Sequence, residues 1–432
     1  MKISNFKPNL LFFIRTNIWI GLTVFIKAIA QLIILKIVTT FYGSSAIGYL
    51  GQVLSFITVI SSLLNVGLIN FLATELSKFK NNLDKIKSIY GMVSFWCMSI
   101  AGLFFVLSIF FNSWFSYIIF GTEKEKIFFI ALSAGYLLLN VSTIVQGFFS
   151  AHKNVKSIFW YNLTSLALGL TLFYVILKQN QDFIPYAALA FYFSSGLIGL
   201  LFLLKQDRNV KYLLRPVYDR FFFTKILKFT VVMSVTGGLG ALQQIYMRNH
   251  IINRLNLTWT DVGHWQALLK ISEINLSFIG MTMVSLYLPS ISVLQHSHEL
   301  IKTVQKYLTR VLIIVSLISV FFQLFASEIL TLIYSKDFIF LSPLLKIQMI
   351  GDIFKLSSWV FTYFFLAKLN IKIFLLVEMF GLGLLTVLGI FLSKVYLIKG
   401  LVLGQFIASL VMFFVSCLIY MYYSRRERFW NQ

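Results

Sequence analysis

The chain has 432 residues, of which 59% are hydrophobic and 12% charged, and its mean hydropathy is +0.84. These values lie far outside the range of soluble domains and predict an integral membrane protein. A formal net charge of +22 would suggest a nucleic-acid partner in a soluble protein, but basic loops that set membrane topology explain it here. Because the apolar runs are continuous and do not alternate, transmembrane helices are preferred to a β-barrel.

In chain order, the apolar runs predict about twelve membrane-spanning helices, since each run has the length of about 20 residues that a bilayer requires. Lys2 and Lys7 precede the first run, which lacks a small-residue cleavage site, so we expect it to remain as a span. Cys97 and Cys417 lie inside apolar runs, which argues against a disulfide framework. The predicted spans are 12–40, 46–74, 88–112, 126–149, 157–177, 183–204, 229–253, 262–290, 304–326, 343–367, 371–393 and 400–423.

The basic residues predict the orientation. An even number of spans places both termini on one side, and the loops of that side hold about three times as many Lys and Arg residues as the opposite loops. Both termini are therefore predicted to be cytoplasmic. The longest loop on this side, 205–228, mixes basic and aromatic residues. It is expected to include an amphipathic helix on the inner leaflet or, equally, to be an ordinary linker.

Two short segments suggest an internal repeat. IGYLGQVL at 47–54 resembles VGHWQAL at 262–268, with one residue deleted. The offset is close to half of the chain, which predicts two six-helix repeats of the same orientation. The predicted organisation is an N-terminal bundle (1–204), the linker (205–228) and a C-terminal bundle (229–432). The outward loops are too short to hold a catalytic domain.

Charged residues inside the spans are the candidate functional residues, because a charge at the bilayer centre costs about 3 kcal/mol or more. Gln266, Lys270 and Glu273 are spaced to share one helix face, as are Gln348, Asp352 and Lys355. Each stripe joins an amide, a base and an acid, which suits a hydrated polar or anionic ligand.

The alternative for each stripe is an intrahelical ion pair, Lys270 with Glu273 or Asp352 with Lys355, that only lowers the cost of burial. That alternative explains Lys27 and Arg248 poorly, because neither has an acid three or four residues away. Their surplus positive charge predicts a negatively charged ligand. Glu378 is a weaker candidate that could pair with a cation on a neighbouring helix or bind a coupling proton.

No motif supports catalysis. The sequence has no phosphate-binding glycine loop and no nucleophile elbow, and its histidines lack metal-ligand spacing. We therefore expect no enzyme activity, no metal and no cofactor.

Several motifs resemble a known family. FYGSSAIGYLGQ at 41–52 looks like the opening of Wzx-type polysaccharide flippases, although Ser44 stands where that family often has Pro. WTDVGHWQALLKISE at 259–273 is similar to a segment of the enterobacterial common antigen lipid III flippases. YLP at 287–289 and QMIGDIFK at 348–355 also resemble that group. The matches extend over nearly the whole chain and keep their order.

This resemblance implies the fold of the multidrug/oligosaccharidyl-lipid/polysaccharide (MOP) exporter superfamily, with two six-helix bundles forming a V around a central cavity. It also implies transport of an undecaprenyl-pyrophosphate-linked oligosaccharide, for O-antigen or a related polysaccharide of lipopolysaccharide biosynthesis, across a bacterial inner membrane by alternating access. Lys27 and Arg248 would hold the pyrophosphate. The glycan route would be lined by Gln266, Lys270, Glu273, Asp352 and Lys355. The expected partners are the lipid-linked oligosaccharide, membrane lipids and, as further candidates, a polysaccharide polymerase and a chain-length regulator.

Two other functions remain open at this stage. A cation-coupled multidrug exporter of the same fold is one, although a cavity for cationic drugs should be lined mainly by acids. A membrane glycan polymerase or glycosyltransferase is the other, and it would need a catalytic acid on a sizeable loop.

Overall fold

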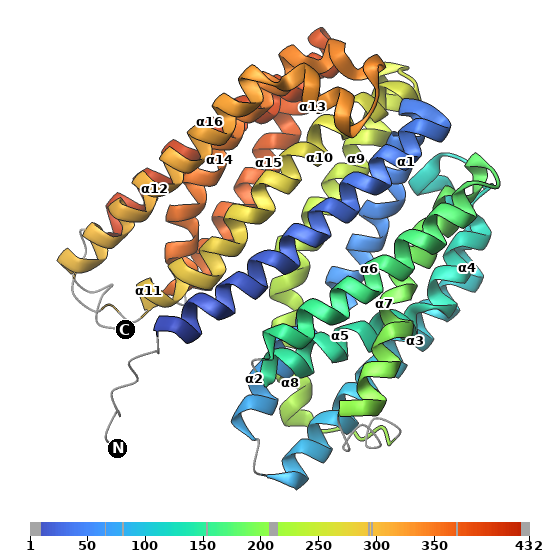
Figure 1. Ribbon diagram of the computed structural model, residues 1–432, viewed down its shortest axis with the longest axis vertical. Helices are drawn as coiled ribbons and strands as arrows, with labels where there is room; N and C mark the ends of the chain where they lie inside the picture. The colour runs from blue at the N-terminus through green and yellow to red at the C-terminus, as the bar shows by residue number, and fades with distance from the viewer. Residues whose placement is uncertain are drawn as a thin grey trace. The chain divides into compact units, whose positions relative to one another are not determined.

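The computed structural model describes residues 10–64, 66–79, 82–152, 154–206, 215–292, 294, 297–368 and 370–424. Every regular element in these ranges is a helix (Figure 1), so the predicted all-α membrane fold is confirmed. Some residues used in the orientation argument lie outside the described ranges: Lys2, Lys7, Lys80, Lys153, Arg208, Lys211, Arg425, Arg426 and Arg428. The first part of the expected amphipathic linker, 207–214, also lies outside them.

Sixteen α-helices are described in these ranges. They are α1 (Leu10–Leu64), α2 (Val66–Lys78), α3 (Leu83–Phe120), α4 (Lys126–Ala134), α5 (Tyr136–Ala151), α6 (Val155–Leu177), α7 (Ile184–Gln206), α8 (Arg220–Met233), α9 (Leu239–Leu255), α10 (Trp259–Thr282), α11 (Leu288–Ser292), α12 (Ser297–Leu324), α13 (Ala326–Ile333), α14 (Ser342–Ala367), α15 (Ile371–Tyr396) and α16 (Ile398–Ser424). Each of the twelve predicted spans falls on one of these helices or on a consecutive pair.

Seven described helical stretches are long and apolar enough to cross a membrane, or eight if α4 and α5, bent by 44°, form one span. The first stretch, Ile18–Lys78, contains two of the predicted spans. The predicted spans outside this set are 229–253, 262–290 and 343–367. These segments carry Arg248, the pair Lys270 and Glu273, and the pair Asp352 and Lys355, so the less apolar helices are the ones that hold the candidate site.

Local breaks divide the long helices. Gly43 interrupts α1 with φ 73° and ψ −161°, a conformation that glycine adopts without steric cost. Widened π-helical turns at Ser234–Gly238 and Met283–Tyr287 join α8 to α9 and α10 to α11. Such turns insert an extra residue and change the direction of the helix, while its backbone hydrogen bonding continues.

The contacts group the chain into two compact units. The first comprises Met1–Ile34 and Ile60–Ser234, and the second comprises Leu35–Val59 and Val235–Gln432. The break in α1 at Gly43 and the helical turns after it therefore belong to the second unit, together with the C-terminal helices. Residues 220–228, part of the predicted linker, form the first turns of α8 in the first unit.

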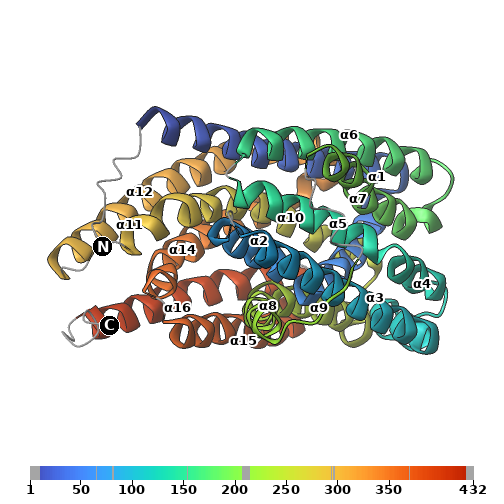
Figure 2. The same cartoon turned by 90° about the horizontal axis from the view of Figure 1, so that it is seen from below.

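Each unit has its own apolar core. In the first unit, Phe71, Phe222 and Ile226, all 0% exposed, pack α2 against α8. In the second, Val360, Phe364 and Tyr420 pack α14 against α16, and Figure 2 shows α14, α15 and α16 side by side. These clusters are built as in soluble domains, from interlocking large apolar side chains.

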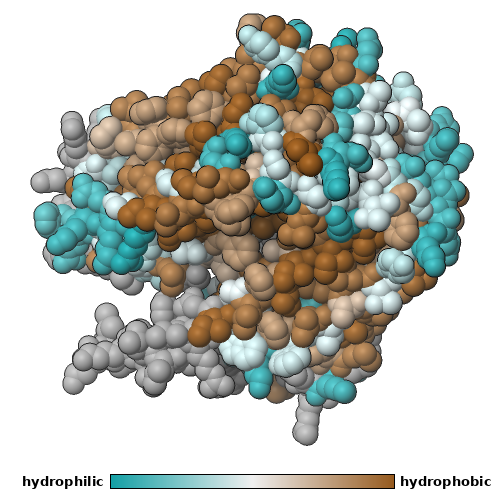
Figure 3. All heavy atoms as spheres, turned by 45° about the horizontal axis from the view of Figure 1, so that its top comes forward, coloured by the Kyte–Doolittle hydropathy of each residue, from teal (hydrophilic) through white to brown (hydrophobic). Residues whose placement is uncertain are grey.

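The outer surface is apolar as well. Leu317 on α12 and Leu376 and Phe391 on α15 are each 66–67% exposed. Figure 3 shows one face on which hydrophobic residues form broad continuous areas, with hydrophilic residues gathered in patches. Monomeric soluble proteins rarely expose such large apolar areas, so these helices are built to face lipid.

Candidate substrate-binding site

The polar site of the second unit begins with the hairpin of α9 and α10. Asn256 ends α9 in the left-handed conformation, with φ 53°. Two residues later, Thr258 starts α10 with a capping box, in which the Thr258 backbone amide donates to Asp261 Oδ2 at 2.9 Å. This short connection satisfies the free amides of the helix start and holds the two helices close to each other along their polar faces.

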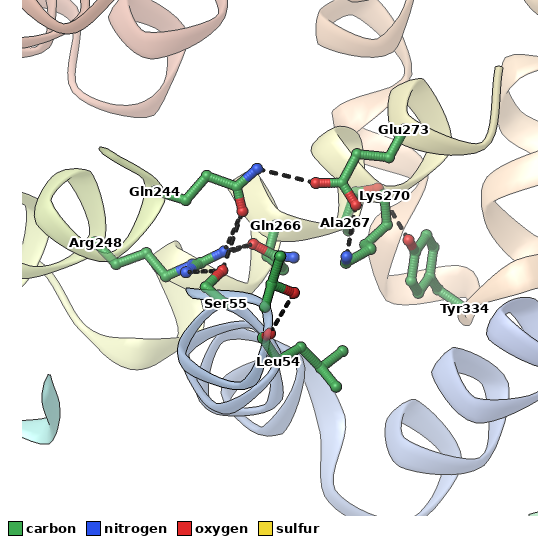
Figure 4. A network of polar contacts seen from close by, with 10 residues as sticks. Leu54, Ser55, Gln244, Arg248, Gln266, Ala267, Lys270, Glu273 and Tyr334 are labelled. Carbon is green, nitrogen blue, oxygen red and sulfur yellow. Dashed lines mark hydrogen bonds and ion pairs between the residues drawn. The ribbon is translucent and has the colours of Figure 1, made fainter. Parts of the chain in front are cut away.

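Arg248 lies at the centre of this site and is 0% exposed. Its guanidinium donates five hydrogen bonds. Nε and Nη2 donate to Gln266 Oε1 (3.1 and 2.6 Å), Nη2 also donates to Gln244 Oε1 (3.0 Å), and Nη1 donates to Ser55 Oγ (2.9 Å) (Figure 4). Nη1 also donates to Gln52 Oε1 at 3.2 Å. All of these acceptors are neutral. The arginine is therefore solvated by amides and a hydroxyl, which meets the requirement that a buried charge be hydrogen-bonded.

The two repeat-like segments meet at this arginine. Gln52 and Gln266 occupy equivalent positions in the two motifs, and each presents its side-chain carbonyl to Arg248. The motif glycines, Gly48 and Gly263, allow α1 to approach α10 closely, because a Cβ on Gly48 would lie 2.8 Å from the Gly263 backbone nitrogen. Both copies of the motif thus bind the Arg248 side chain, inside the second unit.

A relay connects Arg248 to the charged stripe of α10. Gln244 accepts from Arg248 with its oxygen and donates from Nε2 to Glu273 Oε1 at 3.0 Å. The other oxygen of Glu273 pairs with Lys270 Nζ at 2.5 Å, so the intrahelical ion pair considered from the sequence does form. Two cations and one carboxylate share the network, which leaves a formal charge of +1. The side chains of Lys270 and Glu273 are 15% and 34% exposed, so this end is accessible to a ligand.

The second stripe, on α14, is used differently. Asp352 is 0% exposed and accepts from Ser272 Oγ at 2.7 Å and from Asn275 Nδ2 at 3.4 Å, both on α10. Within the described residues Asp352 and Lys355 form no ion pair. The acid therefore joins α14 to α10. The side-chain amide of Gln348 is buried, without a hydrogen-bond partner among the described residues.

Lys355 lies one turn further along α14. It lines a small cavity of about 90 Å³ that is shared with Glu378 of α15 and Ser409 of α16. The sequence suggested that Glu378 could pair with a cation on a neighbouring helix. The cavity brings that acid and Lys355 to the same space, but within the described residues the pair is not in salt-bridge contact.

Lys27 belongs to the first unit, on α1. Its side chain is half-buried, and the structure records no hydrogen bond or ion pair for it among the described residues. The predicted residues of the second unit therefore gather around Arg248 and along the facing sides of α10 and α14, while Lys27 is described with the other unit.

Some residues of the site were not identified from the sequence. Gln244 lies one helical turn before Arg248, so the i, i+4 spacing could have indicated it. Gln52 and Ser55 come from a helix almost 200 residues away, and nothing local marks them as partners of Arg248. Trp265, which precedes Gln266 in the motif, is only 3% exposed, so it packs inside the protein.

Comparison with known proteins supports the resemblance. No protein-family model matches the chain. Two curated proteins named "Lipid III flippase", from Escherichia coli (strain K12) and Shigella flexneri, are each 23% identical over 431 residues, covering 95% of this chain and 99% of the relative. These relatives are transporters and not enzymes.

Solved structures share the fold. An inward-facing multidrug resistance MATE family transporter of the MOP superfamily matches with a TM-score of 0.77 and 13% identity, covering 92% of this chain and 94% of that one. A MOP superfamily transporter from Pyrococcus furiosus, whose report describes a binding pocket of reversed polarity, matches with a TM-score of 0.68 and 14% identity, covering 96% of each chain. The chain is therefore a multi-pass membrane protein with the fold of the MOP transporter superfamily, and its curated relatives are flippases.

Proposed function

We propose that this protein is a flippase that moves an undecaprenyl-pyrophosphate-linked oligosaccharide from the cytoplasmic to the periplasmic leaflet of a bacterial inner membrane, with both termini in the cytoplasm. The glycan is destined for O-antigen or a related surface polysaccharide. The support from relatives is the full-length similarity to proteins named lipid III flippases. The structural observation that carries the proposal is a network with a formal charge of +1, made by Arg248, Lys270 and Glu273 on α9 and α10, which hold two of the spans predicted from the sequence.

Such a network suits a pyrophosphate. Without a ligand, Glu273 neutralises Lys270, and Gln244 connects this pair to Arg248. A phosphate oxygen offers the same kind of acceptor as a carboxylate oxygen, so it can take the place of Glu273 beside Lys270. Glu273, which is 34% exposed, can then turn to water. Because all the donors of Arg248 are engaged, we assign the first phosphate contact in this conformation to Lys270 and a long-range attraction to Arg248.

The remaining predicted residues keep proposed roles along the same route. Gln266 orients Arg248 through two hydrogen bonds. Asp352 supports the glycan route by holding α14 against α10, and Lys355 offers a polar group to the glycan from α14. Lys27 is proposed as a phosphate-binding cation of the first unit. The polyprenyl chain can remain in the lipid while the headgroup crosses by alternating access.

The test is surface-polysaccharide assembly in a strain from which the gene is deleted and then restored. Lys270→Gln and Lys27→Gln should each reduce surface polysaccharide at least tenfold at normal protein level, because each removes a cation without changing the backbone. Lys306→Gln, an exposed lysine on α12, is the matched control and should have no effect. Full polysaccharide with both Lys270→Gln and Lys27→Gln would show that cations do not bind the substrate.

A cation-coupled multidrug exporter is the second candidate, because structural neighbours include a multidrug resistance transporter. The network disfavours it, since two cations against one acid repel a cationic drug. Drug-susceptibility profiles of an overexpressing strain separate the two functions: a flippase leaves them unchanged, whereas an exporter raises resistance to several cationic compounds.

A further inference from the structure

The first unit contains a second polar cavity that the transport proposal does not use. It has a volume of about 560 Å³ and lies where the ends of α3 and α6 meet the starts of α4 and α7. Its lining combines charged and polar side chains with apolar ones: Lys124, Glu125, Ile127, Ile176, Gln179, Asp182, Phe183 and Tyr186. The volume lies within the range of about 300–1,000 Å³ that is typical of small-molecule sites.

Both loops of this cavity are held by their own hydrogen bonds. Ser116 donates to the Thr122 carbonyl at 2.6 Å and accepts from the Glu125 amide at 3.2 Å, which places Glu125, only 8% exposed, in the wall. On the other side, the Asn180 carbonyl accepts from the Phe183 amide at 3.1 Å and closes a tight 3-10 turn. The walls are therefore fixed before a ligand arrives, which lowers the entropy cost of binding.

The composition of the wall indicates the class of ligand. Phe183 and Tyr186 are neighbouring aromatic rings with centroids 6.0 Å apart, and such rings offer flat faces to the C–H surface of a sugar ring. Two carboxylates, one amide and one ammonium group surround them and can pair with several hydroxyls. Two carboxylates against Lys124 leave a formal charge of −1, which opposes an anionic ligand. The two aromatic faces and the Gln179 amide favour a neutral saccharide over a simple cation.

We infer that this cavity binds a saccharide, the glycan part of the transported lipid, at the periplasmic end of the first unit. The inference rests on the proposed function and its orientation, which put the loops at 121–125 and 178–183 on the periplasmic side. Aromatic faces hold the sugar ring, and Glu125, Asp182 and Gln179 bind its hydroxyls. An open cavity suits a chain-like ligand, because only one or two sugars need to enter while the rest extends into water.

The experiment uses the full-length protein in lipid nanodiscs, an oligosaccharide probe and tetramethylammonium as a competing cation. The probe is the free repeat-unit oligosaccharide, released by mild acid from the undecaprenyl-pyrophosphate-linked intermediate of the strain, and binding is measured by saturation-transfer NMR and calorimetry. The wild-type protein should bind it. Tyr186→Leu should weaken binding about tenfold, since it removes an aromatic face, and Asp182→Asn should weaken it severalfold.

Glu123→Gln is the matched control, because Glu123 is an exposed acid of the same loop that does not line the cavity. It should bind the probe like the wild type. Asp182 is exposed, so Asp182→Asn remains informative if Tyr186→Leu does not fold. Equal binding by the wild type and both cavity variants, no binding by the wild type, or selective binding of tetramethylammonium in place of the oligosaccharide would each overturn the inference.

Failure of this inference can be distinguished from failure of the proposed function. Loss of surface polysaccharide on gene deletion, together with no binding of the free oligosaccharide, contradicts the cavity assignment alone. Full surface polysaccharide after gene deletion contradicts the flippase function itself, whatever the nanodiscs bind.

Discussion

The two units bury a charge in different ways. In the first unit, Glu75 of α2 is 1% exposed and forms two ion pairs, with Lys225 of α8 at 2.7 Å and with Lys78 at 3.3 Å. In the second unit, Arg248 is 0% exposed and contacts neutral acceptors only, with Glu273 reached through Gln244. The acid is neutralised directly, whereas the arginine keeps its positive charge.

This difference separates a structural charge from one suited to function. The direct pair with Lys225 fixes α2 to α8. Glu75 and its two lysines also carry a formal charge of +1, but Lys78 is 58% exposed, so water and salt screen the surplus charge. A guanidinium that is solvated by amides stays charged and projects a positive potential into an apolar surrounding. On this view, Glu75 clamps α2 to α8, and Arg248 attracts an anionic headgroup. Four changes test the comparison.

The largest effect is expected for Arg248→Met. Methionine fills much of the volume, but it removes the Arg248 donors from the side-chain oxygens of Gln52 and Gln266, and buried unsatisfied groups cost about 1–3 kcal/mol each. Ser55 and Gln244 keep the hydrogen bond between them. We expect a loss of about 3–5 kcal/mol in the free energy of unfolding, measured by denaturant or thermal unfolding in detergent. Surface polysaccharide should be lost as well.

Arg248→Lys is the control for this prediction. Lysine keeps the charge, but its ammonium is a single donor centre that cannot reach the acceptors of α1, α9 and α10 together. Its stability should lie between that of the wild type and Arg248→Met. If Arg248→Met is as stable as the wild type, the hydrogen-bond network does not hold the second unit together.

The sequence predicted part of this site and not the rest, for physical reasons. The grouping of Gln266, Lys270 and Glu273 follows from helical spacing, so it could be predicted. The packing of α1 on α10 could not, because it depends on a close approach at Gly48 and Gly263 that no periodicity reports. The motif match indicated a repeat, but it did not indicate that both copies bind the same arginine.

The alternatives left open for the two stripes also had different outcomes. Lys270 and Glu273 form the expected ion pair, whereas Asp352 binds Ser272 and Asn275 of the neighbouring helix. Spacing along one helix predicts which residues can pair, but burial against another helix decides which do. The all-α fold was easier to predict, since the length and apolarity of the runs determine it.

A smaller effect is expected for Glu75→Gln. Glutamine keeps the shape but removes the charge opposite Lys225, whose side chain is 29% exposed and also lies 4.1 Å from the ring of Phe221. Because Lys225 can turn partly to water, we expect a loss of about 1–2 kcal/mol, less than for a fully buried pair. Unfolding in detergent measures it, and transport should be nearly normal. A loss of transport at normal stability would contradict a purely structural role of Glu75 between α2 and α8, and it would assign a functional role to this residue.

The next effect concerns the start of the same helix, α8. Asp219 caps it by accepting from the amides of Phe221 (2.9 Å) and Phe222 (3.3 Å), and it accepts from Ser88 Oγ at 2.6 Å. Asp219→Ala should cost about 1 kcal/mol at neutral pH. Burial alone would raise the pKa of Asp219, but the bonds from Ser88 and the two amides outweigh it, so the pKa lies below its usual value.

This lowered pKa has a consequence for pH dependence. A carboxyl whose pKa is depressed in the folded state contributes stability above its ordinary pKa of about 3.9, and that contribution is lost as the pH falls through the folded value. Unfolding midpoints measured between pH 7 and pH 3 should therefore fall more in the wild type than in Asp219→Asn, which keeps a capping oxygen but cannot titrate. Parallel curves would show that Asp219 does not contribute to acid lability.

The smallest effect is expected for Lys78→Ala, which removes the other partner of Glu75. The Lys78 side chain is 58% exposed and pairs with Glu75 within one helix, and exposed pairs of this kind contribute about 0–1 kcal/mol. Glu75 keeps Lys225 at 2.7 Å, so its charge stays neutralised, and we expect a change below about 0.5 kcal/mol in the free energy of unfolding. A double-mutant cycle of Lys78→Ala with Glu75→Gln measures the pair alone. A coupling energy as large as that between Glu75 and Lys225 would mean that both lysines stabilise Glu75 equally. The ion pair between α2 and α8 would then not be the main interaction that neutralises the buried charge of the first unit.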